Sequence, residues 1–416
     1  MPQLRRRDAG YSEHMSTSLA EHRAAVARLV EKADARRGAR TENVHVTALS
    51  SPLRLAEDVL SAQDLPPFDN SQMDGYAVAA HELAGATPER PITLPVAAPI
   101  PAGADAGVHT PGTAAPIMTG APVPKGADAV VPIEKVEPSR FDVSEISFST
   151  PPPPGQFVRP QGDDVSRGAV LLPRGTWTTP ATIGSLTAAR VRSVRVETAL
   201  RVAIVSSGDE IASGQLADGN GVALTAAVRE LGASPTRHVV ADDQAELRAL
   251  FEELSATSDL VLTTGGISAG AYEVVRQVLE PLRDAWFDHV PLQPAGPQGW
   301  AVWDGLPIIC FPGNPVSTLI SFELFVRPVL ARACGVVSPD RPTGTGPLAE
   351  ALESPLGKLQ VRRGRVDDDG LVHLVGGAGS HLLSSYAAAS HLVFVPAEAG
   401  RLAAGDTVAW WRIAAH

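Results

Sequence analysis

The chain has 416 residues, 44% hydrophobic and 19% charged, which is an ordinary globular balance and predicts roughly two to four domains. The net charge of −11 argues against a general nucleic-acid binder, which needs a basic surface. Only two cysteines, Cys310 and Cys334, are present, which excludes a disulfide framework or a cysteine-rich metal site and fits a reducing, cytoplasmic compartment. Because no run of about 18 apolar residues occurs, we expect no membrane-spanning segment.

The first half of the chain predicts one helix followed by a β-rich region. Residues 16–36 place apolar side chains at helical spacing, so they predict a helix with one buried face. From residue 65 to 159, short apolar runs alternate with proline and glycine. Proline at this density excludes long helices, and we therefore expect a compact β domain.

The second half predicts an α/β domain and then a small β domain. In residues 198–334 apolar strands alternate with helices, which favours a parallel sheet covered on both faces. The expected strands are 201–206, 236–240, 260–264 and 307–311, and the expected helices are 222–231, 243–255, 272–280 and 316–333. Residues 338–416 return to short strands, at 358–366, 371–374, 391–396 and 407–412.

Three of the expected parallel strands end in loops of small residues, at 206–210, 264–270 and 310–317. Open α/β sheets bind ligands at the carboxyl ends of their strands, where small residues let backbone N–H groups approach an anion. Asp209 and Glu210 add hard oxygens suited to a divalent cation. The pattern indicates a pocket for a phosphate-bearing ligand and a metal, although each glycine loop taken alone is also typical of a tight turn.

Two further polar loops stand out. Residues 68–78 contain more polar side chains than a hairpin turn at Asp74-Gly75 requires, but such a turn remains an alternative. The acidic pair Asp163-Asp164 follows Arg159 and Gly162, and its simplest interpretation is a solvated surface charge.

Taken in order, these segments resemble the molybdopterin molybdenumtransferase family, which includes bacterial MoeA and the E domain of gephyrin. The most specific matches are 66–78, 119–131, 206–210, 264–270 and 311–317, and the resemblance runs from about residue 16 to the C-terminus. It implies a multidomain α/β plus β fold with four parts. These are a helical linker domain at 16–64 and 160–197, an inserted β domain at 65–159, a MogA-like α/β domain at 198–334 and a C-terminal β barrel at 338–416.

The resemblance also implies an activity: molybdate is inserted into adenylylated molybdopterin with release of AMP, and Mg²⁺ is required. The residues that match the family motifs are Asp74, Thr119 and Asp209 as catalytic groups, Ser71, Gly265, Gly266, Ser268, Pro312, Gly313, Asn314, Pro315 and Ser317 as binding groups, and Asp163, Asp164 and Asp209 as metal ligands.

Four positions depart from the family pattern. The family glutamate of Gly-Glu-Asp is Asp163 here, and the acidic residue after Gly270 is Ala271. The family Asp-Ser-Asn segment corresponds to a stretch around Asn220, where we expect a loss of polar groups facing the ligand. The lysine of the family Gln-Pro-Gly-Lys-Pro segment is lost at Gly296, and that lysine is suited to pair with molybdate or phosphate.

The resemblance also implies a homodimer, in which the second subunit completes the cleft. The alternative to an active insertase is a gephyrin-like scaffold that binds a peptide of a cytoskeletal, cell-division or membrane-receptor partner. For that alternative the expected contacts are Tyr386, Phe394 and residues 339–347, although both aromatic residues also suit a hydrophobic core.

Overall fold

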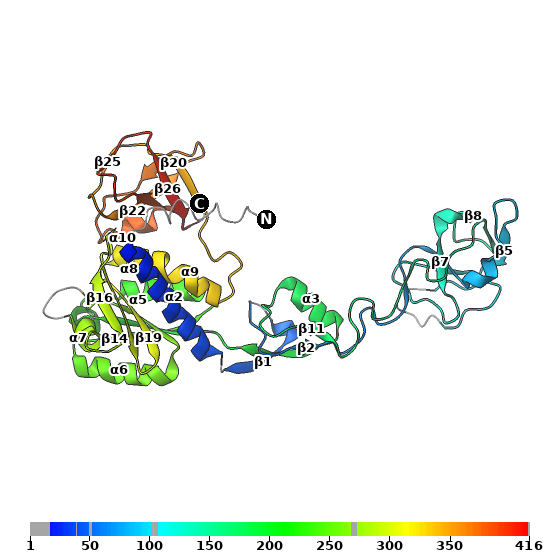
Figure 1. The fold of residues 1–416 in the computed structure, drawn as a ribbon, viewed down its shortest axis with the longest axis horizontal. Coiled ribbons are helices and arrows are strands. Elements are labelled where there is room, and N and C mark those ends of the chain that lie inside the picture. Colours follow the sequence, from blue (N-terminus) through cyan, green and yellow to red (C-terminus); the bar gives the residue numbers. More distant parts are fainter. Residues whose placement is uncertain are drawn as a thin grey trace. The chain divides into compact units, whose positions relative to one another are not determined.

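The computed structural model describes residues 17–38, 40–49, 52–100, 103, 107–267 and 273–414. They form two compact units, which we describe separately: unit 1 takes residues up to Glu42, Ser50–Arg54 and Val196 onward, and unit 2 takes Asn43–Leu49 and Leu55–Arg195. The predicted fold class, α/β plus β, is confirmed (Figure 1). Among the described residues, no helix is long and apolar enough to cross a bilayer. The finer four-part division stays a prediction.

Unit 1 is built on a six-stranded sheet with the order β14-β13-β15-β19-β18-β16. Its strands are β13 Arg201–Ser207, β14 Ser234–Val240, β15 Leu260–Thr264, β16 Ala285–His289, β18 Pro297–Trp303 and β19 Leu306–Phe311. The first four in spatial order are parallel, as predicted, whereas β18 is antiparallel to both of its neighbours, β19 and β16. Neither β16 nor β18 was predicted, and Gly299 interrupts the apolar pattern of β18. Glycine is required there because an added Cβ would lie 2.3 Å from the Phe287 ring on β16.

Helices cover both faces of this sheet (Figure 1). The helices of unit 1 are α2 Thr17–Arg37, α4 Asp209–Ala212, α5 Gly219–Glu230, α6 Gln244–Thr257, α7 Val274–Leu279, α8 Pro315–Ser321, α9 Arg327–Ala333 and α10 Leu383–Ala387. The long helix expected at 316–333 is interrupted by a π-helical turn, η4 Phe322–Val326. Pro328 has no N–H to donate to the carbonyl of Leu324, so a regular α-helix cannot continue through this point.

Alternate residues of β13 enter two separate cores. Ile204 packs in one core with residues of α2, α5, α8 and α9, whereas Val205 packs in the other with residues of α6 and α7. The first core continues into the C-terminal strands through Leu359 and Phe394. Because Phe394 is only 1% exposed, its predicted contact with a partner peptide is wrong; it is a core residue.

The C-terminal strands of unit 1 form a second six-stranded sheet and a small strand pair. The sheet contains β17 Leu292–Gln293, β20 Thr343–Pro347, β22 Leu359–Val366, β23 Val372–Leu374, β24 His391–Val395 and β26 Thr407–Arg412, and the pair is β21 Leu352–Glu353 with β25 Arg401–Leu402. Strand β17 follows β16 in the chain and pairs in parallel with β22. The loop after β17 is therefore held beside the start of β22.

Unit 2 consists of short strands, brief 3-10 turns and one α-helix, which confirms the β-rich character predicted for 65–159. Its helix is α3 Pro180–Ala188, and its 3-10 turns are η1 Val46–Ala48, η2 Ala80–Leu83 and η3 Ile133–Lys135. The strands, two of which continue across a unit boundary, are β1 Thr41–His45, β2 Val59–Leu60, β3 Asn70–Ser71, β4 Gly75–Val78, β5 Ile92–Pro95, β6 Ala115–Ile117, β7 Ala129–Pro132, β8 Val136–Glu137, β9 Glu145–Phe148, β10 Val158–Arg159, β11 Val170–Leu172 and β12 Ser193–Glu197. Strand β4 pairs with β6 and β7 rather than with β3, so Asp74-Gly75 is not a hairpin turn.

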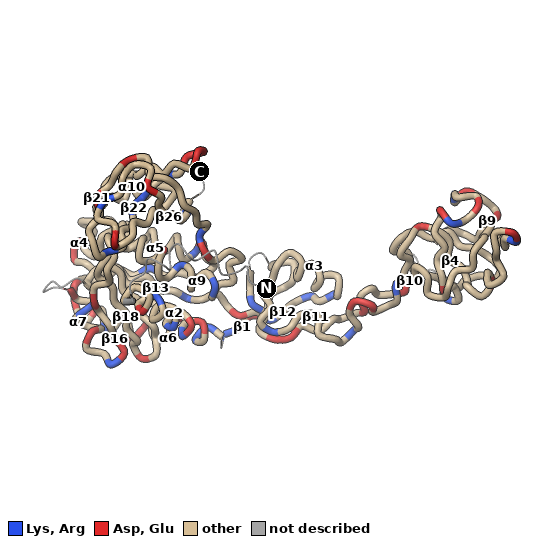
Figure 2. Tube along the Cα trace, turned by 45° about the horizontal axis from the view of Figure 1, so that its top comes forward, with Lys and Arg blue, Asp and Glu red and all other residues tan. Residues whose placement is uncertain are grey.

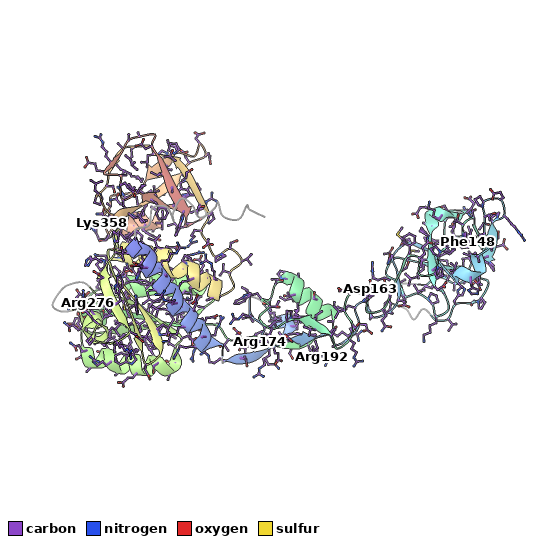
Figure 3. The ribbon with its side chains drawn as sticks, in the orientation of Figure 1. Phe148, Asp163, Arg174, Arg192, Arg276 and Lys358 are labelled. Atoms are coloured by element: carbon purple, nitrogen blue, oxygen red, sulfur yellow. The ribbon has the colours of Figure 1, made fainter. Side chains whose placement is uncertain are left out.

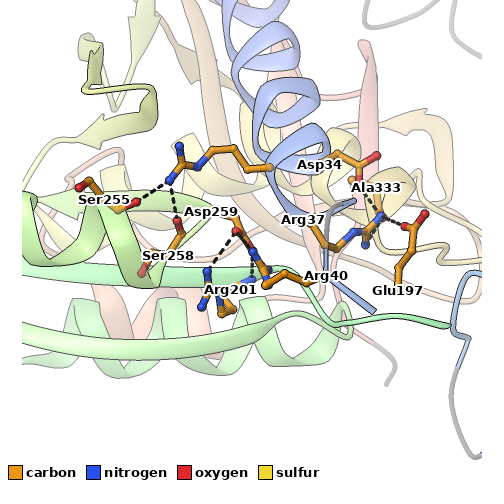
Figure 4. A network of polar contacts seen from close by, with 10 residues as sticks. Asp34, Arg37, Arg40, Glu197, Arg201, Ser255, Ser258, Asp259 and Ala333 are labelled. Atoms are coloured by element: carbon orange, nitrogen blue, oxygen red, sulfur yellow. Dashed lines mark hydrogen bonds and ion pairs between the residues drawn. The ribbon is translucent and has the colours of Figure 1, made fainter. Parts of the chain in front are cut away.

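A network of ion pairs anchors the end of α2 to the sheet of unit 1 (Figure 4). Asp259, just before β15, is 1% exposed, and its two carboxylate oxygens accept hydrogen bonds of 2.7 and 2.6 Å from the guanidinium of Arg40. The backbone N–H of Arg201 donates to the same carboxylate at 2.8 Å. A bidentate pair of this kind fixes both partners, because it satisfies a carboxylate that burial would otherwise penalise.

We predict that Asp259→Ala lowers the free energy of unfolding of unit 1 by about 3 kcal/mol, because it leaves the Arg40 guanidinium without its buried partner. Urea unfolding followed by circular dichroism measures the change. The control is Arg276→Ala, which removes the more exposed pair with Glu280 on α7 and should cost about 0.5 kcal/mol or less. Equal losses in the two variants would contradict the role given to the buried pair.

Candidate functional site

Strands β13, β15 and β19 are parallel neighbours, so the loops that follow them meet at one edge of the sheet of unit 1. A pocket of about 1130 Å³ opens there. Among the residues that line it are seven of the predicted binding residues: Gly265, Gly266, Pro312, Gly313, Asn314, Pro315 and Ser317. The structure therefore brings together loops that lie about 100 residues apart in the sequence, as expected for a ligand site at the carboxyl ends of parallel strands.

The glycines of this pocket are required by close approach of the backbones. Gly265 has φ +91°, and a Cβ added there would lie 2.9 Å from the carbonyl oxygen of Ser207. A Cβ added at Gly313 would lie 3.2 Å from the Cα of Gly265, which is tighter than most real contacts. Backbone therefore forms this wall of the pocket, in which the N–H of Gly265 donates to the carbonyl of Phe311 at 3.2 Å.

Asn220 connects two of the three loops. Its side-chain amide donates to the hydroxyl of Thr264 at 3.0 Å and to the carbonyl of Gly313 at 2.7 Å. Asp218, the N-cap of α5, accepts from Ser206 Oγ at 2.7 Å. Asp218 and Asn220 both line the pocket, so the expected loss of polar groups around Asn220 is wrong: a polar residue stands on each side of Gly219.

One end of the pocket is acidic. Glu210, Asp242 and Glu273 line it, and Asp209 lies directly beside it, with its Oδ1 accepting a 2.9 Å hydrogen bond from the backbone N–H of Asp242. Burial raises the pKa of Asp242, and the nearby carboxylates of Asp209, Glu210 and Glu273 raise it further. Asp209 itself is not among the described lining residues, whereas the neighbouring Glu210 is.

The acidic end offers hard oxygens without forming a closed metal cage. In the described part of the chain, no group of three or more His, Cys, Asp or Glu side chains is arranged to hold a metal ion. Mg²⁺ is usually held by one or two carboxylates, with water and substrate phosphates completing its octahedron. The donor set of Glu210 and Asp242 fits that mode of binding, and the repulsion that raises the pKa of Asp242 is what a bound cation relieves.

Some lining residues were missed from the sequence. Lys358 and the segment 378–380 reach the pocket from the C-terminal part of unit 1, and His289 reaches it from β16. No local motif marks these residues, whereas the lining residues 293–297 belong to the segment already singled out at Gly296. The register in which β17 pairs with β22 is what brings them to the pocket, and this register is not visible in either segment alone.

Two other predicted residues come together in unit 2. Asp74 Oδ1 accepts from the backbone N–H and from the hydroxyl of Thr119, both at 2.7 Å. These bonds, the backbone one first, hold the pKa of Asp74 below its usual range. Ser71 is fully buried, and its hydroxyl donates to the carbonyl of Met73, so it supports the backbone of this loop.

The remaining predicted residues are placed as follows. Asp163 and Asp164 are exposed and lie in unit 2, where their backbone N–H groups donate to the carbonyls of Pro160 and Leu65. Unit 1 by itself therefore supplies Asp209 but not the other two predicted metal ligands. Ser268 and Ala271 lie outside the described residues.

Charge in the described residues is mixed along both units, with Lys and Arg interspersed among Asp and Glu (Figure 2).

Three sequence families match successive stretches of the chain between residues 17 and 413. Residues 17–189 match the MoeA N-terminal region (domain I and II), residues 203–332 a probable molybdopterin binding domain, and residues 345–413 the MoeA C-terminal region (domain IV).

Individual relatives cover nearly the whole chain. Molybdopterin molybdenumtransferase 2 of Mycobacterium tuberculosis is 40% identical over 95% of this chain and 99% of its own length. Molybdopterin molybdenumtransferase of Haemophilus influenzae is 32% identical over 85% of this chain and 89% of its own. A crystal structure of the molybdopterin biosynthesis moeA protein from Pyrococcus horikosii covers 93% of this chain and 99% of that chain, with 30% identity and a TM-score of 0.71. The chain described here belongs to the MoeA family.

Proposed function

We propose that this protein is a molybdopterin molybdenumtransferase of molybdenum cofactor biosynthesis, which inserts molybdate into adenylylated molybdopterin and releases AMP. The observation that carries the proposal is the pocket of unit 1, where the family loops at 264–267 and 311–317 meet at one sheet edge. The 40% identity to a relative named as such a transferase supports the same assignment.

Each wall of the pocket has a task in this reaction. The glycine loops present backbone N–H groups to an anionic ligand, and cleavage of a phosphoanhydride calls for such positioning rather than a covalent nucleophile. Asn220 ties the loop of Thr264 to that of Gly313, so both are held in place before the ligand binds. Preformed donors need no reorganisation during the reaction, which is why they stabilise developing charge effectively.

The acidic end suits the cation that the family requires. Glu210 and Asp242 would hold Mg²⁺, and the Asp209 carboxylate orients this end by accepting from the backbone of Asp242. Bound Mg²⁺ supplies electrostatic stabilisation of charge on the phosphate oxygens. The assignment of Asp163, Asp164 and Asp209 as metal ligands stays a proposal, and so does the homodimer in which a second subunit completes the cleft.

Cytoplasmic localisation is also part of the proposal. It rests on Cys310 and Cys334, which are both buried and free, in keeping with a reducing compartment. The scaffold alternative gains no support from the described residues, because Phe394 is core and Tyr386 is half-buried against that core.

We predict that the purified protein releases AMP from adenylylated molybdopterin when molybdate and Mg²⁺ are present, and that Gly265→Ala lowers kcat/KM by about a hundredfold. The added Cβ would meet the Ser207 carbonyl at 2.9 Å and displace the loop, and misplacement on this scale has such an effect on rate. Chromatography of the released nucleotide measures the rate. The matched control is Gly184→Ala on α3, where nothing lies within 4 Å of the added Cβ and the rate should not change. Wild-type protein that releases no AMP would contradict the proposal.

A second prediction concerns Asp74, the proposed catalytic carboxylate of unit 2. Thr119→Val removes the hydroxyl donor but keeps the backbone donor, so the pKa of Asp74 should rise part of the way towards its ordinary value. Because the folded-state pKa is depressed, the stabilisation from this carboxylate is present at neutral pH and lost as pH falls through that pKa. At neutral pH, Thr119→Val should therefore lose part of the stabilisation that the ionised Asp74 carboxylate gives the folded state.

Carbon-13 NMR titration of the Asp74 carboxyl group measures this shift. The control is Thr113→Val, whose hydroxyl donates to the carbonyl of Thr110 and should leave the titration of Asp74 unchanged. An unchanged pKa in Thr119→Val would show that the hydroxyl does not stabilise the ionised form.

A further inference from the structure

Anion binding in the pocket has to overcome an acidic environment. Four lining residues are carboxylates, namely Glu210, Asp218, Asp242 and Glu273, and only Asp218 among them has a basic partner within the described residues, Arg237 at 3.1 Å. The substrates of the proposed reaction, molybdate and a phosphate-bearing pterin, are anions. A cation held by Glu210 and Asp242 would offset part of this negative charge, and a basic side chain nearby would favour an anion further.

Lys358 is the one lysine or arginine among the described residues that line the pocket. It is exposed, and in the part of the chain that the structure describes it forms no ion pair with a carboxylate. Figure 3 shows it where the C-terminal strands of unit 1 meet the α/β part. An exposed lysine is ordinary on a protein surface. A lysine without an ion pair, in a pocket that holds four carboxylates and no arginine among its described lining residues, is positioned to meet an anionic ligand.

The strand register explains how Lys358 reaches this place. Leu359 and Gln360 of β22 pair in parallel with Leu292 and Gln293 of β17, and the N–H of Leu359 donates to the carbonyl of Pro291. Lys358 therefore lies at the start of β22, beside the strand that leads into 294–297. That loop also lines the pocket, and it contains Gly296, the position at which the family pattern has a lysine.

We propose that Lys358 supplies the cationic contact for a tetrahedral dianion in this pocket, in place of the lysine absent at Gly296. This inference rests on the proposed function, and it names the residue that recognises the charge of the substrate. Two parts of the substrates share this chemistry: molybdate, and the phosphate of the adenylyl group.

Gly296 can accept a lysine, which makes a rescue experiment possible. Its φ is not in the left-handed region, and the nearest atoms to an added Cβ are 3.5 to 3.7 Å away, at ordinary contact distance. The double variant Lys358→Met with Gly296→Lys therefore removes the lysine at 358 and places one in the loop between β17 and β18.

The test is isothermal titration calorimetry of the full chain with sodium molybdate and, separately, with AMP. We expect Lys358→Met to weaken the binding of molybdate, of AMP or of both about tenfold. The ligand whose affinity falls identifies the dianion that Lys358 contacts. The affinity of the wild type for that ligand should also fall with rising salt, because exposed charge pairs are screened. Lys358→Arg should retain binding, and Lys32→Met, which removes an exposed lysine of α2 outside the pocket, should change neither affinity.

Unchanged binding of both ligands in Lys358→Met would overturn the proposal. Recovery of binding in the double variant Lys358→Met with Gly296→Lys would support it, whereas loss without recovery would refute the claim that the two positions serve the same anion. Because binding is measured without turnover, a wild-type protein that binds molybdate but releases no AMP would contradict the proposed function and leave the role of Lys358 standing.

Discussion

The close approach of the loops after β13 and β15 is the constraint on which the rest of the site depends. Gly265 and Gly266 lie against Ser207, and a Cβ added at either glycine would come within 3.0 Å of that residue. Gly313 lies against Gly265 from the third loop. With no side chains between them, three backbones form one wall. A side chain added at Gly265 or Gly266 would push these backbones apart and change the shape of the wall.

Because this wall is made of backbone, the charged groups that could bind a cation or an anion come from the residues around it. The carboxylates of Glu210, Asp242 and Glu273 favour a cation at one end, whereas Lys358 is the basic residue that the C-terminal part of unit 1 contributes. The substrate of a metal-assisted phosphoanhydride reaction carries negative charge and is bound together with its cation. A pocket with acidic side chains at one end and a lysine elsewhere can bind both the cation and the anionic substrate. The sheet and the C-terminal strands share one hydrophobic core, which holds the acidic residues and Lys358 in fixed positions relative to one another.

Much of this fold was predictable because its signals are local. The apolar strands β13, β15 and β19, and the helices α5 and α6, show clear periodicity, and the glycine loops follow the strands directly. Strands β16 and β18 were missed because proline, glycine and tryptophan obscure the alternation in β18. The helix is interrupted at η4 because of Pro328. From the sequence alone, this proline did not show that a π-helical turn would form before it.

The site was predictable only in part, for the same reason. Gly265 and Pro312 belong to contiguous motifs, so they were found, and the Asp74–Thr119 pair was found from two such motifs. Lys358 has no motif, because its place depends on the pairing of β17 with β22. The polar role of Asn220 was misjudged because the cap at Asp218, which sets the start of α5, is a feature of the folded helix.

The central claim is that this chain performs molybdenum insertion, and rescue of a bacterial strain that lacks its own insertase tests it most directly. The account predicts that expression of the full chain restores the activity of a molybdenum-dependent enzyme in that strain. Failure to restore it, with the folded protein present at a normal level in the cells, would contradict the account.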